Sequence, residues 1–111
     1  MRISGPSVPL RWVERAVLVG TTDQARHGYA IFQEERARSP GRPGFGVQAV
    51  YRALERLGEA GLVREVDPPP EATDPRRAYW RATSNGRRLL RRDLARLEEI
   101  VAAGRERVGH V

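Results

Sequence analysis

The 111-residue chain contains no cysteine, which excludes disulfide bonds, thiolate catalysis and cysteine-ligated zinc or iron-sulfur sites. The fold must therefore be held by packing alone. The chain also lacks lysine: its twenty basic residues are all arginine, and against fourteen acidic residues they give a net charge of +6. This excess favours a polyanionic partner such as nucleic acid or an anionic membrane surface, although a coding bias toward arginine explains the same composition.

Long apolar runs are absent from the sequence as well. No run approaches the roughly 20 residues that a membrane-spanning helix needs. Residues 1–20 have neither the uninterrupted apolar segment nor the cleavage site of a signal peptide. We therefore expect a cytoplasmic protein without a membrane partner. A chain of this length forms one domain with a modest core, which leaves little volume for a deep active-site cavity.

No group of residues has the spacing of a catalytic or metal site. His27 and His110 do not form an H-x-x-x-H pair, and His27 is expected to pack or hydrogen-bond locally. The adjacent pairs Glu34-Glu35 and Glu98-Glu99 would diverge by about 100° on a helix, which is unsuitable for shared acid-base chemistry. We expect no enzyme, no metal site and no cofactor.

The spacing of apolar residues predicts four helices. Residues 1–9 are expected to form a flexible N-terminal arm. Thr21, Thr22 and Asp23 are expected to provide the turn and cap before the second helix, and Thr83 or Ser84 the cap of the fourth. The segment 39–46, SPGRPGFG, is rich in glycine and proline and is predicted to be a loop. The helices are expected over residues 10–18, from 23 or 24 to 37, over 47–59, and from 83 or 84 onward.

Two short strands are predicted between the third and fourth helices. Gly61 stands where a left-handed cap would end the third helix, and the first strand follows at 62–66. Residues 67–75, DPPPEATDP, combine four prolines with three carboxylates and are predicted to form the tip of a hairpin. The chain returns at 77–82, where alternation places Trp80 and Ala82 on one face of the strand, and Tyr79 and Arg81 on the other.

This order of elements predicts a mainly α-helical protein with a small β-hairpin. It is the order of a winged helix-turn-helix domain, expected over residues 10–82 and followed by a C-terminal dimerisation helix over 83–111. In that fold the third helix enters the DNA major groove, while the hairpin, or wing, reaches the flanking backbone or minor groove.

The third helix has the two faces that this role requires. Gln48 can bond an adenine edge, Arg52 a guanine edge, and Arg56 is better placed for a phosphate. For Arg56 alone we favour the alternative, an ion pair with Glu55 or Glu59. The opposite face is apolar and is predicted to pack on the domain through Val47, Val50, Leu54 and Leu57.

Three further residues are candidate DNA contacts. The ring of Tyr51 can pack under the helix or its hydroxyl can reach a phosphate, and the two roles have equal weight. Arg76 and Arg77 follow the proline-rich tip and can enter a minor groove or clamp a phosphate, unless Asp74 and Glu71 neutralise them. Because carboxylates at the tip would repel the backbone, we expect contact through the base of the wing.

The chain resembles the PadR family of transcriptional regulators, of the short kind with a single C-terminal helix. Three segments carry the resemblance: His27-Gly28-Tyr29, VYRALERLGEAGLV at 50–63, and RRAYWRATSNGRR at 76–88. It covers about residues 10–103. It implies a dimeric DNA-binding repressor whose last helix, with help from the first, forms the dimer interface. Ala82 departs from the leucine usual in the family, which thins the core unless Trp80 fills the space.

The last helix supports the dimer independently of the resemblance. Its apolar residues recur at spacings of four, three and four, and one small domain would struggle to cover them. The alternative is that this stripe packs on the first two helices of its own chain. A two-fold dimer implies an inverted-repeat operator. The residues of the predicted dimer interface are Leu90, Leu94, Leu97 and Val101.

Two questions stay open at the level of sequence. Some relatives bind flat aromatic effectors between their last helices, and here Trp12 is the only candidate contact for such a molecule, with core packing its favoured role. The effector, if there is one, is unknown. The competing function is a winged helix that binds another protein and does not read DNA.

Overall fold

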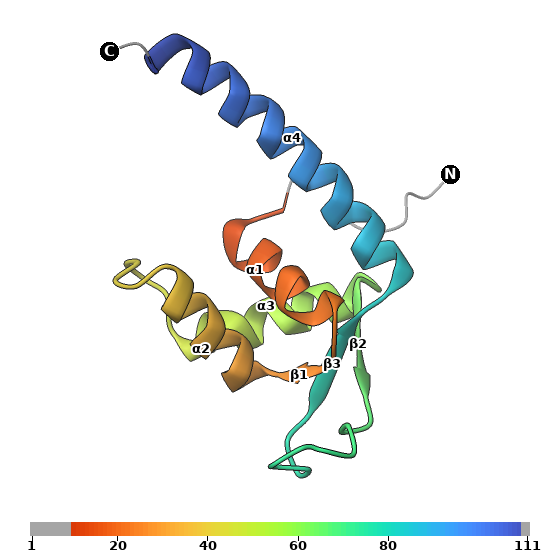
Figure 1. Ribbon diagram of the computed structural model, residues 1–111. Helices are drawn as coiled ribbons and strands as arrows, with labels where there is room; N and C mark the ends of the chain where they lie inside the picture. The colour runs from red at the N-terminus through yellow and green to blue at the C-terminus, as the bar shows by residue number, and fades with distance from the viewer. Residues whose placement is uncertain (1–9, 110–111) are drawn as a thin grey trace.

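The computed structural model describes residues 10–109. The predicted arm at residues 1–9 lies outside them, as does His110. In Figure 1 a long C-terminal helix leads away from a body of three helices and a small sheet, and the hairpin projects from the opposite side of that body. The elements are α1 (Trp12–Thr22), β1 (Arg26–His27), α2 (Gly28–Arg38), α3 (Val47–Glu59), β2 (Val63–Val66), β3 (Tyr79–Ala82) and α4 (Ser84–Val108).

The predicted winged-helix architecture is confirmed, but the sheet has three antiparallel strands in the order β1-β3-β2. The additional strand, β1, pairs Arg26 with Trp80 and His27 with Tyr79. The second helix accordingly begins at Gly28, and the predicted start at residue 23 or 24 is wrong. Two residues are too few to show an alternating pattern, so β1 is recognisable only through its pairing with β3.

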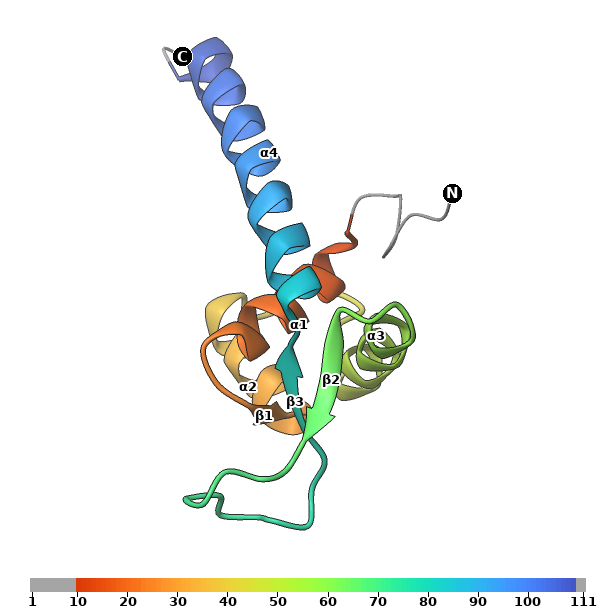
Figure 2. The same cartoon turned by 90° about the vertical axis from the view of Figure 1, so that its right-hand side faces the viewer.

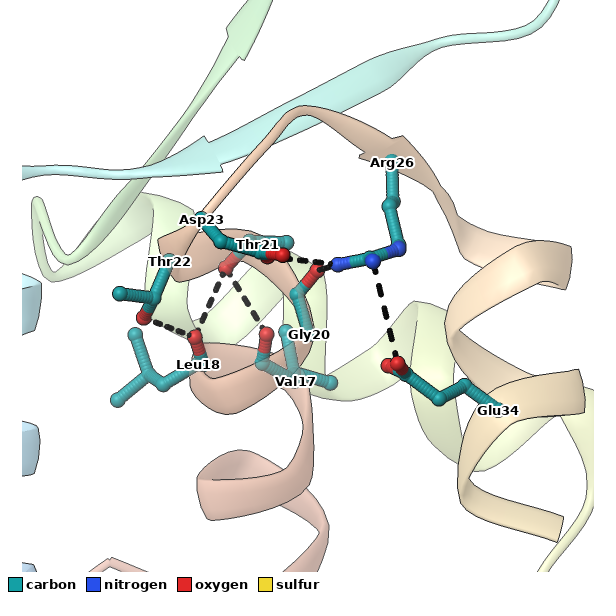
Figure 3. Close-up of polar contacts among 8 residues, drawn as sticks. All are labelled: Val17, Leu18, Gly20, Thr21, Thr22, Asp23, Arg26 and Glu34. Carbon is teal, nitrogen blue, oxygen red and sulfur yellow. Dashed lines mark hydrogen bonds and ion pairs between the residues drawn. The ribbon is translucent and has the colours of Figure 1, made fainter. Parts of the chain in front are cut away.

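Helix α1 continues beyond its predicted end at residue 18. Thr21 and Thr22 do not cap the next helix as predicted but form the last turn of α1, as Figure 3 shows. The Thr21 hydroxyl donates to the carbonyl of Val17 at 2.9 Å, and the Thr22 hydroxyl donates to that of Leu18 at 2.6 Å. The hydroxyls therefore bond back within their own helix instead of forward to the next one.

The turn after α1 is held by Arg26. Its guanidinium donates to the carbonyl of Gly20 at 2.5 Å and to the carboxylate of Asp23 at 2.9 Å. It also lies 3.9 Å from the carboxylate of Glu34 on α2 (Figure 3). One side chain thus joins the end of α1, the start of β1 and the side of α2.

Helix α3 packs on the body through Val50, Ala53, Leu54 and Leu57, while Val47 is half-buried. It ends as predicted. Gly61 has a φ of 76°, a conformation that favours glycine, and the N–H of Leu62 donates to the carbonyl of Leu57 at 2.8 Å. This cap turns the chain directly into β2, as Figure 2 shows for the green segment beside α3.

The core lies between the three helices, the sheet and the first turns of α4. Ala82 is buried, and Trp80 packs against the same core cluster from a half-buried position. Tyr79 is also buried. Thr83 caps α4, as predicted, by accepting the N–H of Gly86 at 3.0 Å. The cluster comprises Leu10, Val17, Leu18, Ile31, Val50, Ala53, Leu54, Leu57, Leu62, Val63, Ala82 and Leu90.

Candidate nucleic-acid interface

The outer face of α3 is polar and open to solvent. Gln48, Arg52 and Glu55 are exposed, on the side of the helix away from its buried residues. None of the three side chains makes an ion pair with another residue in the range 10–109. The predicted readers Gln48 and Arg52 are therefore available to a ligand, and Glu55 adds an acceptor to the same face.

Tyr51 is held by the start of α2. Its ring packs over Gly28 so closely that a Cβ atom at that glycine would lie 2.5 Å from a ring carbon. The residue nevertheless remains 43% exposed. The ring therefore packs beside α3, against α2, and not beneath its own helix. A side chain at position 28 would have to displace the tyrosine ring.

Arg56 is tied to the first helix. Its Nε donates to the carboxylate of Glu14 at 2.9 Å, across 42 residues of sequence. The predicted partners, Glu55 and Glu59, were wrong, although the expectation of an ion pair was right. Glu14 also accepts the backbone N–H of Arg11 at 2.9 Å. Arg56 thus fastens α3 to α1 through its Nε, and a phosphate at this guanidinium would compete with Glu14 for it.

The base of the wing gathers both predicted arginines around one carboxylate. The Nε of Arg77 lies 3.0 Å from Asp74 Oδ2, and the Nε of Arg76 lies 3.8 Å from Asp74 Oδ1. The guanidinium of Arg77 also lies over the ring of Tyr29, 5.5 Å from its centroid. The hydrogen bond from Arg77 lowers the pKa of Asp74 below its ordinary value, so this carboxylate is ionised at neutral pH. The neighbouring Tyr29 was not among the predicted site residues.

His27 connects the start of α2 with the wing. Its Nδ1 accepts the N–H of Ala30 at 3.1 Å, which caps α2, and its ring meets the ring of Tyr79 edge-on at 5.4 Å. The hydroxyl of Tyr79 in turn donates to the carbonyl of Asp74 at 3.2 Å. Burial lowers the pKa of His27, and the charge of Arg77 lowers it further, against the opposing effect of Asp74. The neutral ring is the form that can accept the capping bond.

Helix α4 has an anchored first half and an open second half. Leu90 is only 5% exposed and belongs to the core of its own domain, so its prediction as a dimer contact needs correction. Asp93 is buried too, and its carboxylate lies 2.5 Å from Arg15 of α1. Beyond it, Leu97 is half-buried and the apolar side chains that stand exposed are Leu94, Ile100, Val101 and Val108.

Within residues 10–109, no helix is both long and apolar enough to cross a lipid bilayer. The same residues hold no group of three or more histidine, aspartate and glutamate side chains arranged to hold a metal ion.

The fold, with its exposed third helix and projecting hairpin, defines a winged-helix protein. Residues 17–92 match the transcriptional regulator PadR-like family, and the chain belongs to that family. As a member it is a transcriptional regulator, of a class that binds DNA. The family resemblance predicted from the three sequence segments is therefore confirmed.

Solved structures show the same fold. A PadR family transcription regulator from Clostridium difficile superimposes with a TM-score of 0.74 at 19% identity, over 86% of this chain and 97% of that one. A transcriptional regulator from Clostridium thermocellum gives 0.71 at 20% identity, over 87% and 90%. BldR, a transcriptional regulator from Sulfolobus solfataricus, gives 0.72 at 20% identity, over 92% and 66%. Among curated protein sequences, none matches this chain.

Proposed function

We propose that the protein is a sequence-specific transcriptional repressor that reads DNA with α3. The observation that carries the proposal is the exposed row of Gln48, Tyr51 and Arg52 on a helix whose other side is buried. In this role Gln48 and Arg52 contact base edges in the major groove, and the hydroxyl of Tyr51 contacts a phosphate. The protein acts by binding and not by catalysis.

The arginines at the wing base supply the second part of the proposed interface. Arg76 and Arg77 are on the exposed side of the hairpin, and a phosphate or minor groove beside the α3 site is their proposed ligand. We leave Arg56 out of the proposed contacts, because its side chain is engaged by Glu14. The proposed DNA-binding domain is residues 10–82.

We further propose that the protein is a homodimer formed through α4. The support is a row of apolar residues beyond Asp93 in which Leu94 and Val101 are exposed and Leu97 is half-buried. Residues 83–111 form the proposed dimerisation segment, whose first turns also contribute Leu90 to the core. A two-fold dimer presents two α3 helices, so the proposed operator is an inverted repeat with half-sites about one helical turn apart.

We also propose that a small-molecule effector releases the protein from DNA. The proposed location of the protein is the cytoplasm, because a regulator must reach the chromosome. Trp12 is not the proposed effector contact. Its ring packs against Phe45 at 5.2 Å between centroids, and the guanidinium of Arg42 covers it at 4.1 Å. These contacts support the packing role that the sequence favoured for Trp12.

The function is tested by titrating DNA from upstream of the protein's own gene at several salt concentrations. The proposal expects tighter binding to this fragment than to random DNA, with an affinity that falls as salt rises. Equal binding of both fragments at moderate salt would contradict it and would favour the competing protein-interaction role of the winged helix.

The dimer is tested separately by sedimentation of a Leu94→Arg variant. A charged side chain in the centre of the apolar row should give a monomer with an unchanged fold. Arg96→Glu, at an exposed position on the other side of α4 from Leu94, is the control that keeps the dimer. A Leu94→Arg variant that sediments like the wild type would place the interface elsewhere.

A further inference from the structure

At the base of the wing, two arginines and a backbone N–H converge on a single carboxylate. Asp74 Oδ2 accepts the Nε–H of Arg77 at 3.0 Å, and Asp74 Oδ1 lies 3.8 Å from the Nε of Arg76. The same Oδ1 accepts the backbone N–H of Arg76 at 3.3 Å. All three donors come from the two residues that follow Pro75. The segment therefore forms a small anion site that is filled by its own aspartate.

This set of donors is also suited to a DNA phosphate. Phosphate oxygens are bound in protein-DNA complexes mainly by arginine and lysine side chains together with backbone N–H groups. Both arginines can be approached from solvent, since the Arg76 side chain is 93% exposed and that of Arg77 is 41% exposed. Tyr29 supports the Arg77 guanidinium from the side of α2. A phosphate could reach the site without any opening of the core.

We propose that Asp74 occupies the place of a DNA phosphate in the free protein and thereby weakens binding of the backbone at the wing. The proposal rests on the proposed DNA-binding function and adds an internal competitor to it. When DNA binds, a phosphate displaces the carboxylate from Arg76 and Arg77, because two anions on the same guanidinium groups would repel each other. The exchange is accessible because ion pairs between exposed side chains are weak.

The ionisation of Asp74 agrees with this role. Its pKa is lowered chiefly by the hydrogen bond from Arg77, against desolvation as the next largest cause, and the backbone N–H of Arg76 and the charges of both arginines lower it further. The carboxylate therefore remains charged, and competes, over the whole neutral range. Glu71, also in the hairpin loop, is exposed and makes no ion pair with another residue of the range 10–109. It can repel DNA only through the general field of the protein, which salt screens over about 10 Å.

The experiment compares Asp74→Asn with Glu71→Gln, which removes the same charge from the same loop. Asparagine keeps the oxygen that accepts the Arg76 N–H, so the turn is preserved. Binding to the upstream DNA fragment is measured by fluorescence anisotropy at about 0.1 M salt. We expect Asp74→Asn to tighten binding about three- to fivefold, the size of an exposed ion pair, and Glu71→Gln to change it by less than about 1.5-fold.

A second comparison separates the local exchange from a change in net charge. In a protein that carries Arg76→Gln and Arg77→Gln, the carboxylate has no partner to release, so Asp74→Asn should no longer tighten binding. The proposal is overturned if the two loop substitutions have equal effects, if Asp74→Asn weakens binding, or if its gain persists without the arginines.

A failure of the Asp74 proposal can be distinguished from a failure of the proposed DNA-binding function. Phosphate contacts do not depend on sequence, so the gain from Asp74→Asn is expected on random DNA as well. If the wild type binds DNA without preferring the upstream fragment, the proposal of a sequence-specific repressor is contradicted. The effect of Asp74→Asn is then still measured on random DNA. A wild type that binds no DNA would overturn both.

Discussion

The reading helix and the wing are held in place by different forces. Helix α3 is fixed by four buried side chains and by the ion pair between Arg56 and Glu14, whose partners are 42 residues apart. The wing base is organised chiefly by the contacts of Asp74 within the segment 74–79, and the rings of His27 and Tyr29 add contacts from the start of α2. Side chains that read bases must meet the donors and acceptors of the base edges, whereas phosphate contacts carry no sequence information. The structure thus gives the firmer support to the part that is proposed to read sequence.

The largest expected effect is a loss of stability on substitution in the core beneath α3. Leu54 is 1% exposed, and Leu54→Ala should lower the free energy of unfolding by about 2 to 5 kcal/mol, because it removes apolar contacts and leaves a cavity. Urea denaturation measures it. The matched change in the wing, Glu71→Gln, should stay within about 0.5 kcal/mol of the wild type. A loss for Leu54→Ala as small as that for Glu71→Gln would contradict the firm packing of α3.

A smaller effect is expected from the wing arginine that is most exposed. Arg76→Gln should lower the slope of log affinity against log salt by about 0.9, the amount that one phosphate contact contributes. It should weaken binding to specific and random DNA alike. The measurement is a set of anisotropy titrations at increasing salt. A change that appears only with the specific fragment would show that Arg76 reads bases, which would remove the contrast between helix and wing.

The smallest expected effect is a pH dependence of stability caused by His27, which links α2 to the wing. The pKa of His27 is lowered in the folded protein, so the unfolded chain binds the proton more readily. The stability that neutral His27 provides is therefore complete above its ordinary pKa of 6.5 and is lost as pH falls below that value. His27→Asn keeps a capping oxygen but does not titrate. We expect the wild type to lose more unfolding free energy than this variant between pH 8 and pH 5, and parallel losses would contradict the role of His27.

Much of the fold was predictable because long helices repeat their apolar pattern over several turns. Helix α3 and its glycine cap were predicted to the residue, as α3 extends over 13 residues and has a strong two-sided pattern. Strand β1 could not be predicted, because it has two residues and depends on pairing with the distant residues Tyr79 and Trp80. The end of α1 was missed for a different, local reason: the hydroxyls of Thr21 and Thr22 bond four residues back within α1 and do not form the predicted cap.

The candidate site was predictable to the extent that its contacts are local in sequence. The pairing of Arg77 with Asp74 was one of two alternatives that the sequence left open, because the two residues are only three positions apart. The partner of Arg56 was not foreseen, because Glu14 approaches it only in the folded protein. Leu90 fits the periodic stripe of α4, but only the packing of α4 on the body shows that it belongs to the core. Periodicity identifies an apolar face and does not identify what covers it.

The most direct test of the central claim is the binding of an Arg52→Ala variant to the upstream fragment and to random DNA. Arg52 is exposed on α3, so the fold should be unchanged. The account predicts that specific binding weakens by about 1 to 3 kcal/mol while binding to random DNA changes little. A variant that binds the upstream fragment as tightly as the wild type would contradict the claim that α3 reads the sequence.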